Sequence, residues 1–353
     1  MTIRAEIGED WGLVGHAWAV RALARSLALE RAAHAYLFTG PHAIGKVTLA
    51  RKLAQAWQCA GTVRPCGQCP ACQKIARDRH PDVQIIEGVP VGHKFDEKSP
   101  PPPPRANDWE RRIFKIDQVR ALQHDVARAP FEGRWKIIIL RRFEEANEEA
   151  ANALLKTLEE PHRRTRLILT ARDASLLLPT IASRCQVFAL RPLAPAQIET
   201  ALIAQWRAEP AQARLLAHLC AGRLGWAARA NENRALLDAR DRALDELNHA
   251  MVEGRTERLL RADALSKQSD ELPALLETWL GWWRDVILVQ TGAGTRITNI
   301  DRIDALRKHA EHFTLEQVHG ALQAVRATAR YLTQNINARL ALEVLLLNLP
   351  GKE

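Results

Sequence analysis

His34-Ala-Tyr-Leu-Phe-Thr-Gly-Pro-His-Ala-Ile-Gly-Lys46 joins a short apolar run to a loop that holds two glycines and ends in a lysine. Apolar residues recur at helical spacing directly after it, at Leu49, Leu53 and Trp57. A phosphate-binding loop requires this order of strand, glycine-bearing loop and helix, because its backbone N–H groups must face the phosphates where the helix begins. The segment therefore indicates descent from a nucleotide-binding α/β fold.

The loop departs from a working phosphate loop at one position. Its candidate nucleotide-binding residues are Gly40, Pro41, Gly45, Lys46, Val47 and Thr48. A hydroxyl directly after the lysine normally binds Mg²⁺, and Val47 has none. Thr48 is one residue further on, which turns its side chain about 100° away on a helix. We expect weakened metal binding, and the sequence leaves open whether ATP is still bound.

The apolar run Lys136-Ile-Ile-Ile-Leu140 is typical of a central parallel strand. In phosphate-loop ATPases this strand is followed by acidic residues that bind Mg²⁺ and polarise the attacking water. Arg141 and Arg142 stand there instead, and each like-charge pair costs about 4 kcal/mol at 4 Å with an effective dielectric constant of ~20. We expect no divalent cation at this strand end and no ATP hydrolysis by the chain alone. Glu144 and Glu145 are expected to begin the next helix.

Four cysteines at short spacing follow the helix expected after Lys46. Cys59, Cys66, Cys69 and Cys72 are separated by six, two and two residues, with glycines and prolines between them. Four thiolates at such spacing suit a closed tetrahedral Zn²⁺ site, which has a structural rather than a catalytic function. Four unligated thiols and an iron–sulfur cluster are the alternatives.

Ser183-Arg184-Cys185 lies near the end of the region that alternates between strands and helices. An isolated arginine is usually a surface charge. An arginine presented across a subunit interface can also stabilise the charge of a transferring phosphate. The position of Arg184 just before a linker leaves both interpretations open.

The chain divides into three regions by pattern. Strand and helix patterns alternate over residues 1–190, which predicts an α/β domain with a parallel sheet. Short helices fit residues 191–238 and longer ones residues 239–353, so two helical domains are expected. Residues 88–112 include five consecutive prolines, and we expect a disordered insertion there because the segment cannot bury apolar area.

Composition excludes several classes of protein. The 353 residues are 47% hydrophobic, yet no stretch approaches the ~18 uninterrupted apolar residues of a membrane span. The first residues lack the pattern of a signal peptide, and six cysteines are too few for a disulfide scaffold. We therefore expect a cytoplasmic protein. The net charge of +9 favours polyanionic partners such as nucleic acid but does not decide the function.

Taken together, four stretches resemble the bacterial clamp-loader family of DNA polymerase III, a branch of the AAA+ ATPases. They are His34 to Pro41, Cys66-Gly-Gln-Cys-Pro-Ala-Cys72, Asn152-Ala-Leu-Leu-Lys-Thr-Leu-Glu-Glu-Pro161 and Leu178-Pro-Thr-Ile-Ala-Ser-Arg-Cys185. Weaker similarity continues at Gly222 to Ala227 and at Asn335 to Glu343. The resemblance implies a RecA-like AAA+ domain over residues 1–190, a helical lid over 191–238 and a helical collar over 239–353.

The resemblance also implies a function. Val47, Arg141 and Arg142 match the non-hydrolysing type of subunit, whose nucleotide site is degraded, and Ala171 and Arg172 replace polar sensor residues. Arg184 would then act in trans as an arginine finger on the ATP of an adjacent motor subunit. The implied partners are the gamma/tau and delta subunits in a hetero-pentamer, the beta sliding clamp and primed DNA, at the replisome. The chain would thus belong to a DNA polymerase holoenzyme without being an ATPase itself.

Two other interpretations are weighed against this one. An active gamma/tau-like clamp-loader ATPase predicts ATP turnover by the chain alone. A zinc-knuckle nucleic-acid binder predicts aromatic residues interleaved with basic ones near Cys66 to Cys72, where the only nearby aromatic residue is Trp57. Trp279, Trp282 and Trp283 form one helical stripe, which favours packing in a core or at a collar interface over base stacking.

Overall fold

The computed structural model describes residues 6–8, 11–96, 112–268, 270–334 and 336–351. The chain divides into two compact units. One holds Met1–Leu193 with Arg223–Gly225, and the other holds Ala194–Gly222 with Trp226–Glu353. The second unit thus contains both predicted helical domains, and the boundary between lid and collar stays a prediction.

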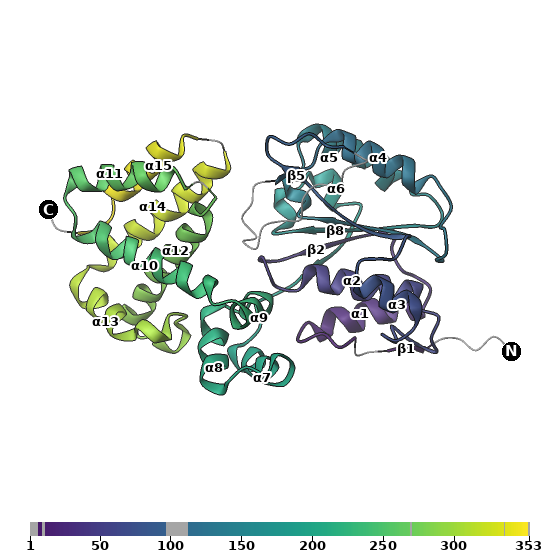
Figure 1. Ribbon diagram of the computed structural model, residues 1–353, viewed down its shortest axis with the longest axis horizontal. Helices are drawn as coiled ribbons and strands as arrows, with labels where there is room; N and C mark the ends of the chain where they lie inside the picture. Colours follow the sequence, from purple (N-terminus) through teal and green to yellow (C-terminus); the bar gives the residue numbers. More distant parts are fainter. Residues whose placement is uncertain (1–5, 9–10, 97–111, 269, 335, 352–353) are drawn as a thin grey trace. The chain divides into compact units, whose positions relative to one another are not determined.

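A five-stranded parallel sheet forms the centre of the first unit (Figure 1). Its strand order is β4-β7-β8-β2-β9. The strands are β2 (Ala35–Thr39), β4 (Val83–Glu87), β7 (Lys136–Arg141), β8 (Thr165–Ala171) and β9 (Gln186–Ala189). The three central strands, β2, β7 and β8, are buried almost throughout, which explains their continuous apolar sequences.

Helices cover both faces of this sheet (Figure 1). Tyr36 and Phe38 of β2 pack on one face with α1 and α2, whereas Leu37 packs on the other face with α4 and α5. This alternation follows from the two-residue repeat of a strand. The helices are α1 (Ala17–Ala28), α2 (Lys46–Gln58), α3 (Pro70–Ala76), α4 (Ile116–Val126), α5 (Glu148–Glu159) and α6 (Pro179–Ala182).

Strand register brings the loops after β2, β7 and β8 to one edge of the sheet. Thr39 is paired with Ala171, and Leu140 is paired with Leu169. Because the strands are parallel, the residues that follow them emerge at this carboxyl edge, where ligands bind in open α/β sheets.

The predicted disordered insertion over residues 88–112 is wrong at its two ends. β5 (Val89–Pro90) pairs in antiparallel fashion with β6 (Arg112–Ile113). Val89 and Arg112 are buried, and Arg112 Nη1–H donates to the Gly88 carbonyl at 3.0 Å. Backbone pairing and this buried contact order the ends of the segment. Residues 97–111, with all five prolines, lie outside the described residues.

Two further details differ from the sequence-based expectations. Glu144 and Glu145 do not begin α5 but close a separate 3-10 turn, Phe143–Glu145. Asn147 then caps α5, since its side chain accepts a hydrogen bond from the Ala150 N–H. In addition, the short strands β1 (Glu6–Ile7) and β3 (Val63–Arg64) form a separate parallel pair.

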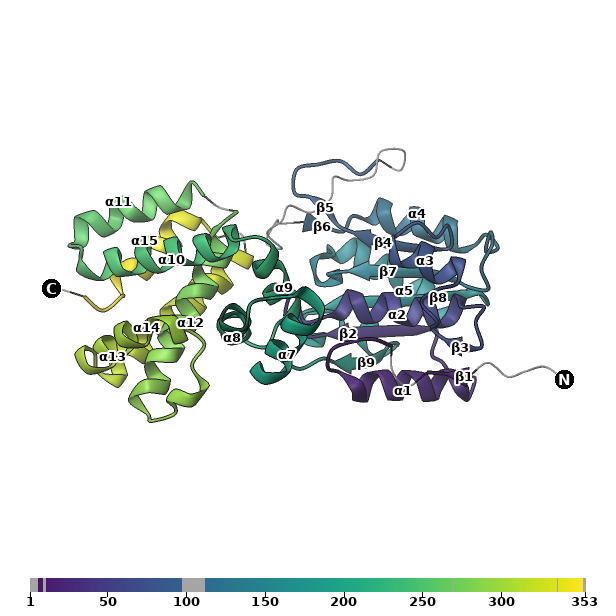
Figure 2. The ribbon, with the colours of Figure 1, turned by 60° about the horizontal axis from the view of Figure 1, so that its bottom comes forward.

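The second unit is helical (Figure 2). Its elements are α7 (Pro195–Trp206), α8 (Pro210–Leu219), most of α9 (Leu224–Glu232), α10 (Ala235–Val252), α11 (Arg255–Ser266), α12 (Leu272–Gln290), α13 (Ile303–His312), α14 (Leu315–Thr333) and α15 (Ala338–Leu347). The predicted tryptophan stripe on α12 is core, because Trp279, Trp282 and Trp283 are all almost fully buried. Among the described residues, no helix is long and apolar enough to span a bilayer.

Candidate functional site

The glycine-bearing loop connects β2 to α2 at the carboxyl edge of the sheet. Gly40 and Gly45 have positive φ values of 137° and 109°. A Cβ atom at Gly40 would lie 2.6 Å from the Leu190 carbonyl oxygen, so only glycine fits there. Lys46 begins α2 and is buried, and its Nζ donates to the Pro41 carbonyl at 2.8 Å as well as to the Gly40 carbonyl. The lysine therefore binds the loop's own backbone in this structure.

Two contacts to this loop come from residues that the sequence did not single out as site residues. His16 Nε2 lies 3.1 Å from the Ile44 carbonyl oxygen, and burial lowers the pKa of this imidazole. The Gly225 N–H donates to the Ala43 carbonyl at 2.9 Å, and Gly225 groups with the first unit. No local pattern marks His16, whereas Gly225 lies within the weakly similar stretch from Gly222 to Ala227.

The residues after the lysine offer little to a metal ion. Val47 is half-buried, and its side chain has no oxygen. Thr48 has a hydroxyl but is exposed. The first turn of α2 also has no acidic residue. Weakened metal binding at Val47 stays a prediction.

Both arginines at the end of β7 bind carboxylates. Arg141 forms an ion pair with Glu87 at the end of β4, and Arg142 Nη2 lies 3.1 Å from Glu145 Oε2. The backbone of Arg142 is left-handed, with φ of 57°, and its N–H donates to Thr170 Oγ1 at 3.0 Å. Acids from neighbouring segments therefore compensate both guanidinium groups, and the absence of a divalent cation at this strand end stays a prediction.

A third ion pair joins the segments that follow β7 and β8. The Glu144 side chain is almost fully buried, and it accepts a hydrogen bond from the Arg172 N–H at 3.2 Å. Arg172 Nε lies 3.4 Å from the same oxygen, Glu144 Oε1. Burial raises the pKa of Glu145 to about 7, although nearby Arg142 acts to lower it. Both carboxylates that follow β7 thus form ion pairs with arginines of this chain.

Arg184 lies in the loop between α6 and β9. Its Nη2–H donates to Glu159 Oε1 at 2.6 Å, and its Nη1–H donates to the Thr180 carbonyl at 2.9 Å. Its side chain keeps 35% of its surface exposed. The next residue, Cys185, packs against the core, and burial raises the pKa of its thiol to about 12. The half-buried cysteine therefore anchors a loop whose arginine reaches solvent.

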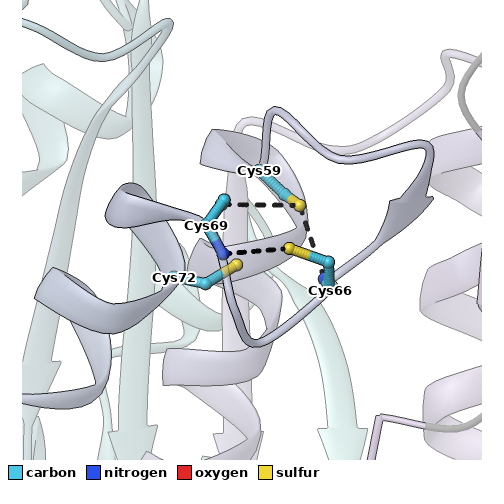
Figure 3. Close-up of side chains that lie close together, drawn as sticks. All are labelled: Cys59, Cys66, Cys69 and Cys72. Atoms are coloured by element: carbon cyan, nitrogen blue, oxygen red, sulfur yellow. Dashed lines mark hydrogen bonds between the residues drawn. The ribbon is translucent and has the colours of Figure 1, made fainter.

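The four cysteines predicted as ligands converge in one cluster (Figure 3). Their Sγ atoms all lie within 4.8 Å of one another. Cys59 Sγ and Cys69 Sγ are 3.9 Å apart, close to the roughly 3.8 Å edge of a tetrahedron with metal–sulfur bonds of ~2.3 Å. The cluster can therefore hold a metal ion such as zinc.

Backbone N–H groups also favour thiolates in this cluster. Gly61 N–H and Cys66 N–H donate to Cys59 Sγ, and Cys69 N–H donates to Cys66 Sγ, at 3.3 to 3.4 Å. Burial acts to raise the pKa of Cys69, but hydrogen bonds from backbone N–H groups and from the Cys72 and Cys66 thiols together lower it to about 6. Burial raises the pKa of Cys59 and Cys72. Helix α3, which was not predicted, begins directly after Cys69 and holds Cys72 in its first turn.

The candidate zinc module offers no platform for base stacking. Trp57 is only 5% exposed and packs against Tyr36. Its position in the sheet core explains why an aromatic residue stands near the cysteines. The zinc-knuckle interpretation as a nucleic-acid binder therefore loses its one aromatic candidate.

The strand order, with a phosphate-type loop after β2 and an arginine loop before β9, defines a RecA-like α/β domain of the AAA+ class. The family model described as "DNA polymerase III, delta subunit" matches residues 15–194, about half of the chain. A second model, "DNA polymerase III, delta subunit, C terminal", matches residues 234–350. The chain belongs to this DNA polymerase III subunit family, which confirms the predicted resemblance.

Individual relatives agree with this assignment. DNA polymerase III subunit delta' of Bacillus subtilis is 29% identical over 335 residues, which cover 94% of each chain. Subunit delta' of Pseudomonas aeruginosa is 39% identical over 43% of this chain and 42% of its own. Subunit tau of Escherichia coli is 34% identical over 53% of this chain but only 26% of its own length. The full-length match is therefore to a delta' subunit, and the tau match covers only part of a longer protein.

Proposed function

We propose that this chain is a non-hydrolysing subunit of a clamp loader. It would support ATP hydrolysis by an adjacent motor subunit and help to load a sliding clamp onto primed DNA. The observation that carries this proposal is the end of β7, where Arg141 and Arg142 occupy the positions of the catalytic acids and form ion pairs with Glu87 and Glu145.

The chemistry of ATP hydrolysis explains why these ion pairs matter. A phosphate-loop ATPase needs carboxylate and hydroxyl oxygens to hold Mg²⁺ and to orient water. This chain has Val47 at the hydroxyl position, and Glu144 and Glu145 are bound to arginines. A divalent cation would have to displace guanidinium groups to reach those oxygens. Whatever nucleotide binds here, we expect no turnover.

Arg184 is the residue that we expect to act on another subunit. It is partly exposed, and the half-buried Cys185 beside it packs against the core. The acids Glu144 and Glu145 of its own nucleotide site form ion pairs with other arginines. A guanidinium can stabilise the charge that spreads over a transferring phosphoryl group. The motor partners would be gamma or tau subunits with a delta subunit completing the complex, since the relatives of this chain include delta' and tau subunits.

The cysteine cluster is proposed to hold a structural zinc ion. Four sulfur ligands leave no open coordination position, so the ion would stabilise the fold rather than take part in a reaction. Cys59 follows α2 directly and Cys72 lies on α3, so the ion would tie these two helices together. The Cys72 carbonyl also accepts a hydrogen bond from Gln55 Nε2 at 2.8 Å.

ATP turnover tests this proposal in two stages. The purified chain with Mg²⁺ and ATP should show no turnover above background, whereas turnover would favour an active gamma/tau-like ATPase. The chain is then assembled with motor and delta subunits, and Arg184→Ala is compared with wild type. The variant should lower turnover at the site it serves by about 10³-fold or more.

Arg163→Ala is the matched control, because Arg163 is an exposed arginine of the same unit. A complex containing Arg184→Ala that keeps full clamp- and DNA-stimulated turnover would remove the trans-acting function.

A further inference from the structure

The guanidinium of Arg184 is held from two sides. Glu159, the last residue of α5, accepts from Nη2 at 2.6 Å. The Thr180 carbonyl in α6 accepts from Nη1 at 2.9 Å. These two contacts fix both the position and the plane of the group, because two nitrogens of one rigid fork are bound at once.

The contacts also leave donors for a ligand. A guanidinium has five N–H donors, and the described residues engage one on Nη1 and one on Nη2 of Arg184. The other three can bind phosphate oxygens without breaking either contact. An arginine that already has its orientation pays less conformational entropy when it meets a phosphate.

Both supports belong to rigid elements of the first unit. Leu154 and Leu158 on the same helix as Glu159 are buried in the core. Ile181, next to Thr180, is also fully buried in that core cluster. Core packing therefore fixes the helix end that carries Glu159 and the turn that carries the Thr180 carbonyl, while the Glu159 carboxylate itself lies at the surface.

We propose that Glu159 is a positioning residue that orients the Arg184 guanidinium for the phosphate of a nucleotide bound by a neighbouring subunit. This inference rests on the proposed trans-acting function of Arg184. The Glu159 side chain is 50% exposed, and an exposed ion pair of this kind contributes little net energy. The Glu159 carboxylate therefore acts as a hydrogen-bond acceptor that orients the guanidinium.

Three substitutions separate this function from a general structural one. Glu159→Ala removes the acceptor, and Glu159→Gln keeps an acceptor oxygen but removes the charge. Glu160→Ala is the matched control, because Glu160 is the next residue and is exposed, whereas the contacts of the Arg184 guanidinium are to Glu159 and Thr180. Each variant is assembled with motor and delta subunits, and the kcat and KM for ATP are measured with clamp and primed DNA present.

We expect Glu159→Ala to lose at least half of the kcat that Arg184→Ala loses, with an unchanged KM for ATP. Glu159→Gln should recover most of the kcat, and Glu160→Ala should match wild type. Gel filtration and thermal unfolding show whether each variant folds and assembles, and Glu159→Gln tests the idea independently if the alanine variant does not.

Two results would overturn the inference, and they differ from failure of the proposed function. If Arg184→Ala lowers kcat while Glu159→Ala does not lower it, Arg184 acts in trans without help from Glu159. If Glu159→Gln is as impaired as the alanine variant, charge rather than orientation matters. If Arg184→Ala itself is silent, both the function and its positioning residue are wrong.

Discussion

Trp279 and Trp283 allow a sharp test of how the second unit is packed. Both lie on α12, one helical turn apart, and both are 0% exposed. The Trp279 Nε1–H donates to the Ala243 carbonyl at 2.6 Å. The Trp283 Nε1 has no hydrogen-bond partner among the described residues. Substitution by phenylalanine removes a similar part of the indole ring at either position. The difference in stability between the two variants therefore reports on the two N–H groups.

The expected difference follows from these contacts. Ala243 lies inside α10, where the helix already uses its carbonyl once, so Trp279→Phe loses a bond with a net value of about 1 kcal/mol. Trp283→Phe removes a buried N–H whose unpaired state costs at least about 1 kcal/mol. Trp279→Phe should therefore be the less stable variant by about 2 kcal/mol or more.

Hydrogen exchange of peptides from α10 and α12 measures this difference locally. About 2 kcal/mol corresponds to roughly 30-fold faster exchange in Trp279→Phe than in Trp283→Phe. Trp18→Phe is the control, since Trp18 lies on α1 of the first unit and is 45% exposed. Equal exchange in the two core variants, or faster exchange in Trp283→Phe, would refute the reasoning.

Two further predictions concern protons and metal. Burial lowers the pKa of His309, with nearby His312 a smaller cause, and its Nδ1 accepts from Trp282 Nε1–H at 3.1 Å. His309 therefore resists protonation in the folded state, whereas in the unfolded state it takes up a proton near its ordinary pKa of 6.5. The stability that neutral His309 contributes above pH 6.5 is therefore lost as the pH falls below that value. We compare the Tm at about pH 7.5 and at about pH 5.5, one value on each side of the ordinary pKa. The Tm of wild type should fall more between these two pH values than the Tm of His309→Gln, and equal falls would contradict this. Cys66→Ala should lose bound zinc and expose residues 59–72 to proteases, whereas Cys220→Ala should keep the zinc; wild type that purifies without zinc would refute the metal assignment.

Much of the first unit can be predicted from local sequence. The runs at Ala35–Thr39 and Lys136–Arg141 are apolar because both faces of a central strand are covered by helices. The helix at Glu148–Glu159 has apolar residues on one face and an asparagine cap. Such signals depend on neighbours within one or two turns, so a sequence pattern is enough to find them.

Other features are invisible to such patterns. The two-residue strands β5 and β6 pair across the segment 97–111 that the structure does not describe, and neither has a periodicity of its own. The sequence of the 3-10 turn Phe143–Glu145 resembles the beginning of a helix. Only the tertiary structure shows that its two glutamates form ion pairs with Arg142 and Arg172. Tertiary contacts overrode local preference at both places.

The amino-acid sequence alone determined which chemical groups are present: four cysteines at metal-binding spacing, Val47 in place of a hydroxyl, and arginines in place of two acids. Only the tertiary structure decided which groups meet. Arg141 meets Glu87, 54 residues away, because β4 and β7 are neighbours in the sheet. Arg184 meets Glu159, 25 residues away, because α5 packs on α6. Strand order and helix packing are set by burial of the whole core, and no local stretch encodes them.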